Sequence, residues 1–386
     1  MLKNECKKML TEQIIPFWSK LEDKENGGFY GFMDFDLNVD KTADKGVILH
    51  NRILWFFSTC YKILGGEENK RLADHAYDFV KNHCIDYEKG GVYWLLDCKG
   101  QPSDTMKHTY NCAFAVYALS AYHNSTGSEE ALQLAYKIFD DIESNTLDEY
   151  GYVESFDRDW KPIPNDALSE NGLMADKTMN AILHLIEAYT ELYKAEKNAK
   201  VGERLRFLLS QMSDIVFDKD TKALRVFFDT AFNVVGDIHS YGHDIEASWL
   251  MDLACDTLGD EALIKKFGAM DLEIAENIAK LAFHGGALYN ERENDKIDKK
   301  RVWWVQAEAV VGFYNAYCRS GDDKYLSIAE SVFEYIKNVQ TDKRCGEWYS
   351  EVSFEGVPDS GKEMVGPWKC PYHNGRMCLE MIRRIK

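Results

Sequence analysis

The chain has 386 residues and a formal net charge of −18 at pH 7. An acidic surface repels phosphate backbones, so we expect no nucleic-acid partner, although this charge does not argue against a neutral ligand such as a sugar. The N-terminus lacks the apolar core of a signal peptide, and no stretch approaches the roughly 18 continuous apolar residues of a membrane helix, so we expect a cytoplasmic protein without membrane contact.

Apolar periodicity along the chain predicts about twelve helices. A single amphipathic helix comes first, over residues 4–21. Pairs of helices follow, at residues 43–64 and 69–84, 105–122 and 129–142, 174–193 and 200–216, 243–258 and 261–282, and 302–318 and 324–339. A single apolar helix over residues 372–385 ends the series.

Turns of small residues followed by aromatic or β-branched residues separate these helix pairs. Clear copies begin at Gly27, Gly90 and Gly285, and four of the turns lie about 60 residues apart. A fixed period indicates one supersecondary unit that is repeated. No proline-rich or serine-rich linker interrupts the series, so we predict one catalytic domain over residues 1–386.

The two helices of each predicted pair differ in character. The first is apolar almost all round, as in residues 113–119, whereas the second carries a one-sided apolar stripe and many charges. A helix that is apolar on all sides is buried, and an amphipathic helix faces water on one side. This pattern predicts an all-α fold, an (α/α)6 barrel of six helical hairpins with short β-like turns between them. An open solenoid is the alternative, but the single first and last helices complete each other only if the ring closes.

The ten cysteines form no Cys-x-x-Cys pair, and several, Cys318 among them, lie within apolar helical patterns. We therefore expect reduced, buried thiols in a cytosolic protein and no metal site.

Polar residues recur near the starts of the six predicted buried helices, where an unpaired polar group costs about 1–3 kcal/mol. If these helices are parallel, the polar side chains meet at one mouth of the barrel. Taken singly, each histidine or tryptophan is more often a structural residue, and only the recurrence points to a site. The candidate residues are Arg52, Tyr110, Asn180, His184, His243, Glu246, Trp249, Trp303, Trp304, Glu308, Trp368 and His373.

These residue types are suited to proton transfer on a sugar. Histidine moves protons near neutral pH, and two histidines on opposite walls can take a proton from one face of a carbon and return it to the other. Glu246, one helical turn from His243, can orient that ring. Arg52 can neutralise the oxyanion of an enediolate, and tryptophans offer flat faces to sugar rings.

Five long segments resemble the N-acylglucosamine 2-epimerase superfamily, and most closely its members that epimerise cellobiose. They are residues 45–55, 176–184, 239–249, 301–308 and 366–374. The resemblance covers essentially the whole chain and implies the (α/α)6 barrel. It also implies reversible epimerisation at C2 of the reducing-end glucose of a β-1,4-linked disaccharide, such as cellobiose, lactose or a mannosyl-glucose, in a monomer or weak homodimer without cofactor or metal.

By the same resemblance, His243 and His373 would transfer the C2 proton through a cis-enediolate. His184 would assist ring opening, Arg52 would bind the enediolate oxygens and Glu246 would support His243. Substrate binding would fall to the remaining residues of the set, which are Tyr110, Asn180, Trp249, Trp303, Trp304, Glu308 and Trp368.

The sequence leaves three other readings open. A related enzyme acting on a monosaccharide, such as an N-acylglucosamine 2-epimerase or a mannose isomerase, would share the histidines and Arg52. A glycoside hydrolase needs two opposed carboxyl groups, for which Glu246 and Glu308 are candidates, but the three histidines would then have no role. A non-catalytic binding barrel would not need a proton-transfer set. Nor does the sequence say which histidine acts on which epimer.

Overall fold

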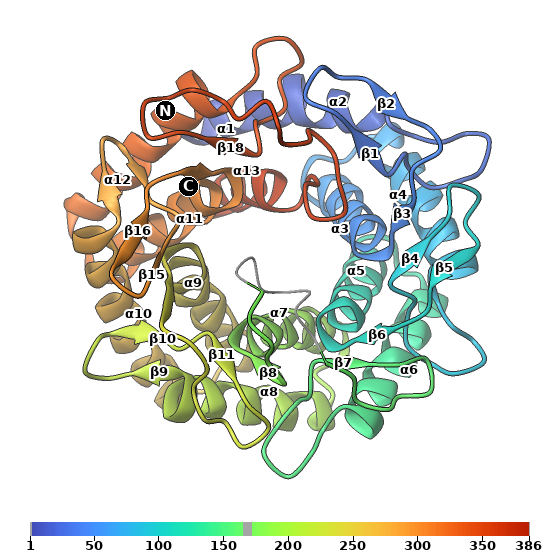
Figure 1. The fold of residues 1–386 in the computed structure, drawn as a ribbon, viewed down its shortest axis with the longest axis horizontal. Helices are drawn as coiled ribbons and strands as arrows, with labels where there is room; N and C mark the ends of the chain where they lie inside the picture. The colour runs from blue at the N-terminus through green and yellow to red at the C-terminus, as the bar shows by residue number, and fades with distance from the viewer. Residues whose placement is uncertain (1, 165–171, 386) are drawn as a thin grey trace.

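Two concentric rings of helices make up the computed structural model, which describes residues 2–164 and 172–385 (Figure 1). The inner ring consists of α3 (Val47–Leu64), α5 (Thr109–Thr126), α7 (Met179–Glu196), α9 (Tyr241–Leu258), α11 (Trp303–Ser320) and α13 (His373–Arg384). The outer ring consists of α1 (Leu2–Met9) and α2 (Ile15–Ser19), α4 (Glu67–Phe79), α6 (Glu129–Asn145), α8 (Ala199–Gln211), α10 (Glu261–Leu281) and α12 (Asp323–Tyr335).

The inner ring is closed. Helix α13 packs against both α11 and α3, and the N-terminal α1 packs against α13. The first and last helices of the chain therefore form the sixth hairpin together, and the (α/α)6 barrel is confirmed over the open solenoid.

Burial follows the pattern read from the sequence. Every residue of α5 from Thr109 to Tyr122 is buried, because this helix has neighbours on all sides. Its partner α6 buries one stripe at helical spacing, running from Ala131 to Ile142, and leaves its charged face in water.

Four outer helices end in or contain a single π-helical turn, which accommodates one extra residue. These turns are η1 (Leu10–Ile14), η2 (Val80–Cys84), η3 (Met212–Val216) and η4 (Ile336–Gln340). After η2, η3 and η4 the chain leaves the helix and enters the small-residue turn of the repeat.

Short antiparallel strands connect the hairpins at one end of the barrel. A strand comes directly before five of the inner helices, so the backbone enters each of these helices from an extended segment. The pairings are β1–β2, β3–β4–β5, β6–β7, β8–β11, β9–β10, β12–β15–β16, β13–β14 and β17–β18. Their bounds are β1 Phe32–Met33, β2 Val39–Asp40, β3 Lys45–Gly46, β4 Leu95–Leu96, β5 Pro102–Asp104, β6 Lys107–His108, β7 Ser155–Phe156, β8 Lys177–Thr178, β9 Phe217–Asp218, β10 Ala223–Leu224, β11 Phe227–Phe228, β12 Ile238–Ser240, β13 Phe283–His284, β14 Ala287–Leu288, β15 Glu291–Glu293, β16 Lys296–Asp298, β17 Arg301–Val302 and β18 Glu351–Val352.

A buried lysine fixes the entry to several inner helices. Lys45, just before α3, donates to Asp23 in the first glycine turn at 2.7 Å, and Lys107, before α5, donates to Asp86 in the second at 2.9 Å. Lys369, before α13, pairs with Glu347 at 2.8 Å. The glycine turns therefore anchor the starts of the inner helices, which is where the candidate site residues lie.

Substitution of Lys45 by methionine is expected to lower the free energy of unfolding by about 3–5 kcal/mol, because it leaves the buried carboxylate of Asp23 without its positively charged partner. Lys45 and Asp23 are 1% and 0% exposed. Urea unfolding monitored by circular dichroism measures this loss. The matched control is Lys70→Met, whose ion pair with Asp74 is 39% and 37% exposed and is expected to contribute less than about 1 kcal/mol. Equal effects of the two substitutions would contradict the anchoring role of Lys45.

The cysteines are free thiols, as expected, and most are buried. Cys98 and Cys345 are partly exposed. Cys318 is exposed, because the last turn of α11 extends beyond the packed part of the barrel. Across residues 2–164 and 172–385, no helix combines the length and the apolar character that crossing a membrane requires.

Candidate active site

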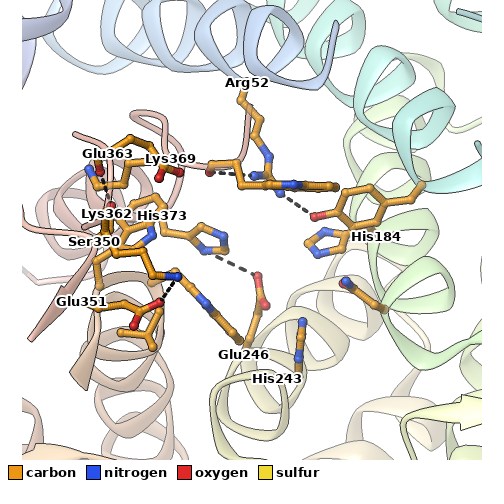
Figure 2. Close-up of a pocket in the computed structure, with 16 residues that line it drawn as sticks. Arg52, His184, His243, Glu246, Ser350, Glu351, Lys362, Glu363, Lys369 and His373 are labelled. Atoms are coloured by element: carbon orange, nitrogen blue, oxygen red, sulfur yellow. Dashed lines mark hydrogen bonds and ion pairs between the residues drawn. The ribbon is translucent and has the colours of Figure 1, made fainter. Parts of the chain in front are cut away.

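The inner helices begin around a cavity of about 300 Å³ at the strand-bearing end of the barrel. Each inner helix, or the residue just before it, contributes at least one side chain, so these helices are parallel and their starts share one mouth (Figure 2). The predicted site residues that line it are Arg52, Tyr110, Asn180, His184, His243, Glu246, Trp303, Trp304, Trp368 and His373.

Three histidines point into the cavity from different helices (Figure 2). Nδ1 of His184 on α7 lies 2.9 Å from Oε2 of Glu187, and Nδ1 of His373 on α13 lies 2.7 Å from Oε1 of Glu308. Nδ1 of His243 on α9 lies 2.7 Å from the hydroxyl of Ser240. Because a protein oxygen binds each Nδ1, Nε2 is the nitrogen left to meet a ligand.

Burial makes two of these imidazoles neutral at physiological pH. It lowers the pKa of His243 to about 3, with a smaller contribution from the nearby His184. Burial and the positive charge of Arg376 hold the pKa of His373 well below its usual range. A neutral imidazole with Nδ1–H bound to a carboxylate has its lone pair on Nε2, so His373 is arranged as a base toward the cavity.

Arg52 on α3 brings a positive charge to the same cavity. Its Nη2 donates to the hydroxyl of Tyr110 at 2.5 Å, and its Nη1 donates to the carbonyl oxygen of Trp368 at 3.4 Å. The guanidinium also lies over the rings of Phe114 and Tyr372, 4.3 and 4.7 Å from their centroids. Arginine remains charged at all relevant pH values, so this site can stabilise an oxyanion.

Aromatic faces form much of the remaining wall. The Trp304 ring lies 4.7 Å from the ring of His243 and 5.6 Å from that of His373, so it contacts both imidazoles. Trp368 is 37% exposed at the mouth, where its face is open to a ligand. Oδ1 of Asn180 has no hydrogen-bond partner in the described part of the chain. These groups suit a polyhydroxylated ligand with apolar ring faces.

Glu246 does not support His243, contrary to the sequence prediction. Its Oε1 instead accepts from Nη2 of Arg376 and lies 4.0 Å from Nδ1 of His373. The carboxylate turns toward α13 because a buried charge is stabilised by a buried countercharge, which a neutral imidazole does not provide. Burial, and next the charge of Glu308, raises the pKa of Glu246 to about 7.

Glu308 and Trp249 were predicted to bind substrate, but neither is part of the cavity lining in the described residues. Glu308 lies behind His373, and its Oε2 accepts from the indole nitrogen of Trp249 at 3.0 Å. Trp249 lies deeper along α9 and borders a second cavity, which opens between the later turns of the inner helices. Both residues therefore support the histidine wall instead of touching a ligand.

Glu246, Glu308 and His373 each offer a ligand atom within 4.8 Å of one another, a spacing that could hold a metal ion. Arg376 already occupies this position with its guanidinium, which bonds to Glu246 and lies 2.8 Å from Glu308. We therefore assign the positive charge of this cluster to Arg376.

Six further residues, which the sequence does not predict, line the cavity. They are Val302, Ser350, Glu351, Lys362, Glu363 and Lys369. Most belong to the segment between α12 and α13, which covers one side of the cavity (Figure 2). Their spacing follows no helical period, so no periodic signal in the sequence marks them. Val302 and Lys369 lie within two of the segments that carry the family resemblance, each beside a predicted tryptophan.

Comparison with known proteins gives consistent results. The model of the N-acylglucosamine 2-epimerase (GlcNAc 2-epimerase) family matches residues 27–374. A cellobiose 2-epimerase of Ruminococcus albus is 66% identical over 385 residues, which cover 100% of this chain and 99% of that protein. A cellobiose 2-epimerase of Eubacterium cellulosolvens is 45% identical, with 99% and 98% covered. The crystal structure of a sugar epimerase from a ruminal bacterium superposes with a TM-score of 0.99 at 65% identity, and all of both chains is covered.

Proposed function

The chain belongs to the N-acylglucosamine 2-epimerase family, and from this premise we propose that it epimerises cellobiose reversibly at C2 of the reducing-end glucose. The product would be glucosyl-mannose, and lactose would give epilactose in the same way. The observation that carries the proposal is that His243 and His373, both neutral, approach the same cavity from different helices and both contact the Trp304 ring, with Arg52 in that cavity. The likeness to proteins named cellobiose 2-epimerase supports cellobiose as the substrate.

In the proposed reaction the sugar ring opens first, with His184 handling the proton between the ring oxygen and O1. One histidine of the pair His243 and His373 then takes the C2 proton through Nε2, and the electron pair of the C–H bond forms a cis-enediolate. Arg52 stabilises its negative charge. Rotation about the C2–C3 bond presents the opposite face, and the second histidine returns a proton.

Tyr110 and Asn180 would bind sugar hydroxyls, and the Trp303, Trp304 and Trp368 side chains would pack against the sugar rings. The steps require proton transfer and an oxyanion partner, both of which these side chains supply, so we propose no cofactor. A cytoplasmic location and a monomeric or weakly dimeric state remain predictions.

A glycoside hydrolase is the less suitable reading of the same cavity. Hydrolysis requires two carboxyl groups on opposite sides of the scissile bond, about 5–10 Å apart with the sugar between them. The Glu246 and Glu308 carboxylates instead lie together on the same guanidinium, and Glu308 is behind His373.

The direct test is incubation of the protein with cellobiose and, separately, with N-acetylglucosamine or mannose, with products identified by NMR. We expect glucosyl-mannose from cellobiose and little turnover of the monosaccharides. Turnover of N-acetylglucosamine or mannose alone would favour a monosaccharide epimerase or isomerase. Release of free glucose from cellobiose without an epimer would favour a hydrolase and refute the proposal.

The pH dependence of kcat/KM should report Glu246. Its pKa of about 7 means that the carboxyl loses its proton as the pH rises from 6 to 8. The ionised form, 4.0 Å from Nδ1 of His373, stabilises the imidazolium that forms when this ring accepts a proton. We therefore expect kcat/KM to rise through pH 7. In Glu246→Gln the rise should disappear and the plateau should fall by about tenfold. If Glu246→Gln showed the same rise in kcat/KM, the rise would come from the titration of another group.

A further inference from the structure

One buried guanidinium connects the carboxylates behind two of the three histidines. We propose that Arg376 is a positioning residue, which holds Glu187 and Glu308 so that His184 and His373 keep Nδ1 protonated and Nε2 directed at the cavity. This inference rests on the proposed function for its catalytic consequence, but the arrangement itself can be tested without turnover.

Arg376 lies in the first turn of α13, three residues after His373, so the two side chains leave the same side of the helix. Its Nη1 donates to Oε1 of Glu187. Its Nη2 donates to Oε1 of Glu246 and lies 2.8 Å from Oε1 of Glu308. One side chain therefore bonds to carboxylates from three other inner helices, α7, α9 and α11.

The guanidinium is held between two aromatic rings. Its central carbon lies 4.2 Å from the centroid of the Tyr372 ring and 4.8 Å from that of the Trp249 ring. The Tyr372 hydroxyl donates to Oε2 of Glu187, and the Trp249 indole donates to Oε2 of Glu308. The same two rings thus fix both the cation and the carboxylates that it binds.

Glu187 and Glu308 bind the two histidines at Nδ1, and the proton on this nitrogen defines the tautomer. Oε2 of Glu187 accepts from Nδ1 of His184, and Oε1 of Glu308 accepts from Nδ1 of His373. Without a cation, several buried carboxylates this close together would repel one another, and some would take up protons. A protonated carboxyl is a poorer acceptor for Nδ1–H, so the imidazoles would lose their fixed tautomer and orientation.

Arg376 acts from behind the site. It is absent from the lining of the candidate cavity in the described residues, and it borders the second cavity, of about 360 Å³, beyond Trp249. Arginine suits this place because its planar fork can bond several carboxylates at once, whereas lysine presents one compact charge.

Arg376→Lys is the test substitution, and Arg383→Lys, on the exposed face of the same helix, is its matched control. In Arg376→Lys we expect kcat for cellobiose to fall at least about 10²-fold with KM within about threefold, as when a catalytic histidine loses its tautomer. Side-chain ¹⁵N NMR of labelled histidine should show His184 and His373 protonated at Nδ1 in the parent and mixed tautomers in the variant. The Arg383→Lys control should match the parent in kcat and in the tautomers of both histidines.

Three results would overturn the inference. One is a folded Arg376→Lys protein with kcat within about threefold of the parent. Another is a loss of kcat while both imidazoles keep the parental tautomer. If circular dichroism shows that Arg376→Lys does not fold, the Glu187→Gln protein replaces it. We expect its His184 ¹⁵N signal to change. An unchanged His184 signal is the third result that would overturn the inference. A parent that shows the expected tautomers but does not epimerise cellobiose would refute the proposed function and leave the positioning role intact.

Discussion

Substitution of His373 by asparagine is expected to lower kcat for cellobiose epimerisation by about 10³-fold, the usual contribution of a general acid–base group. The amide can keep the hydrogen bond to Glu308, 2.7 Å from Nδ1 in the parent, but it cannot accept a proton from carbon. KM should change little, because the ring binds the transition state more strongly than the substrate. Initial rates from product NMR or chromatography measure the effect.

The matched control for this substitution is His284→Asn. His284 is exposed on β13 and stacks on Tyr289, away from the cavity. The His284→Asn protein should retain full activity. If His373→Asn kept turnover within about threefold of the parent, His373 would not transfer the proton and the proposed mechanism would be wrong.

Arg52→Lys is the second substitution with a large expected effect. Lysine preserves the positive charge but loses the fork that bonds both Tyr110 and the backbone of Trp368. The charge would therefore no longer be directed at the enediolate oxygens. We expect kcat to fall by about 10²–10³-fold, as when an oxyanion donor is removed.

Arg71→Lys is the control for this change, because Arg71 is half-exposed and pairs with Glu22 and Glu68 on the outer surface. Its activity should equal that of the parent. Tyr110→Phe should cost less than Arg52→Lys, because it removes a partner of the guanidinium but leaves the charge in place. An Arg52→Lys protein as active as its control would mean that the oxyanion is stabilised elsewhere.

Much of the fold follows from periodicity alone. Helices that are apolar all round, such as α5, alternate with one-sided helices such as α6, and only a closed double ring buries the first kind completely. The helix boundaries lie within a few residues of those expected. The convergence of Arg52, His184 and His373 also follows, because parallel inner helices bring their first turns to one mouth.

The partners of the carboxylates could not be predicted in this way. Glu246 lies one turn from His243 on α9, which favours a local contact, but Arg376 approaches from α13, 130 positions later in the chain. Local spacing says nothing about such a neighbour. Trp249 shows a related limit: six residues beyond His243 is about 9 Å along a helix, which places it below the floor of the cavity.

No periodic pattern in the sequence marks the cavity-lining residues between α12 and α13 either. Ser350 and Glu363 lie in loops, and Glu351 begins the two-residue strand β18, so burial and spacing are unrelated here. The fold of this segment depends on the pairing of β18 with β17 and on the hydrogen bond from Ser350 to the carbonyl oxygen of Glu363. Only a three-dimensional arrangement brings these side chains to the cavity.

The most direct test of the proposed chemistry is epimerisation of cellobiose in deuterated water, stopped at low conversion, with C2 of the product observed by NMR. If His243 and His373 act on opposite faces through an enediolate, the proton returned to C2 comes from a histidine that has exchanged with solvent. Glucosyl-mannose should then carry deuterium at C2 from the first turnovers, and cellobiose should gain it as the reaction approaches equilibrium. Glucosyl-mannose that keeps its original hydrogen at C2 would contradict the removal of the C2 proton by one histidine and the return of a proton by the other.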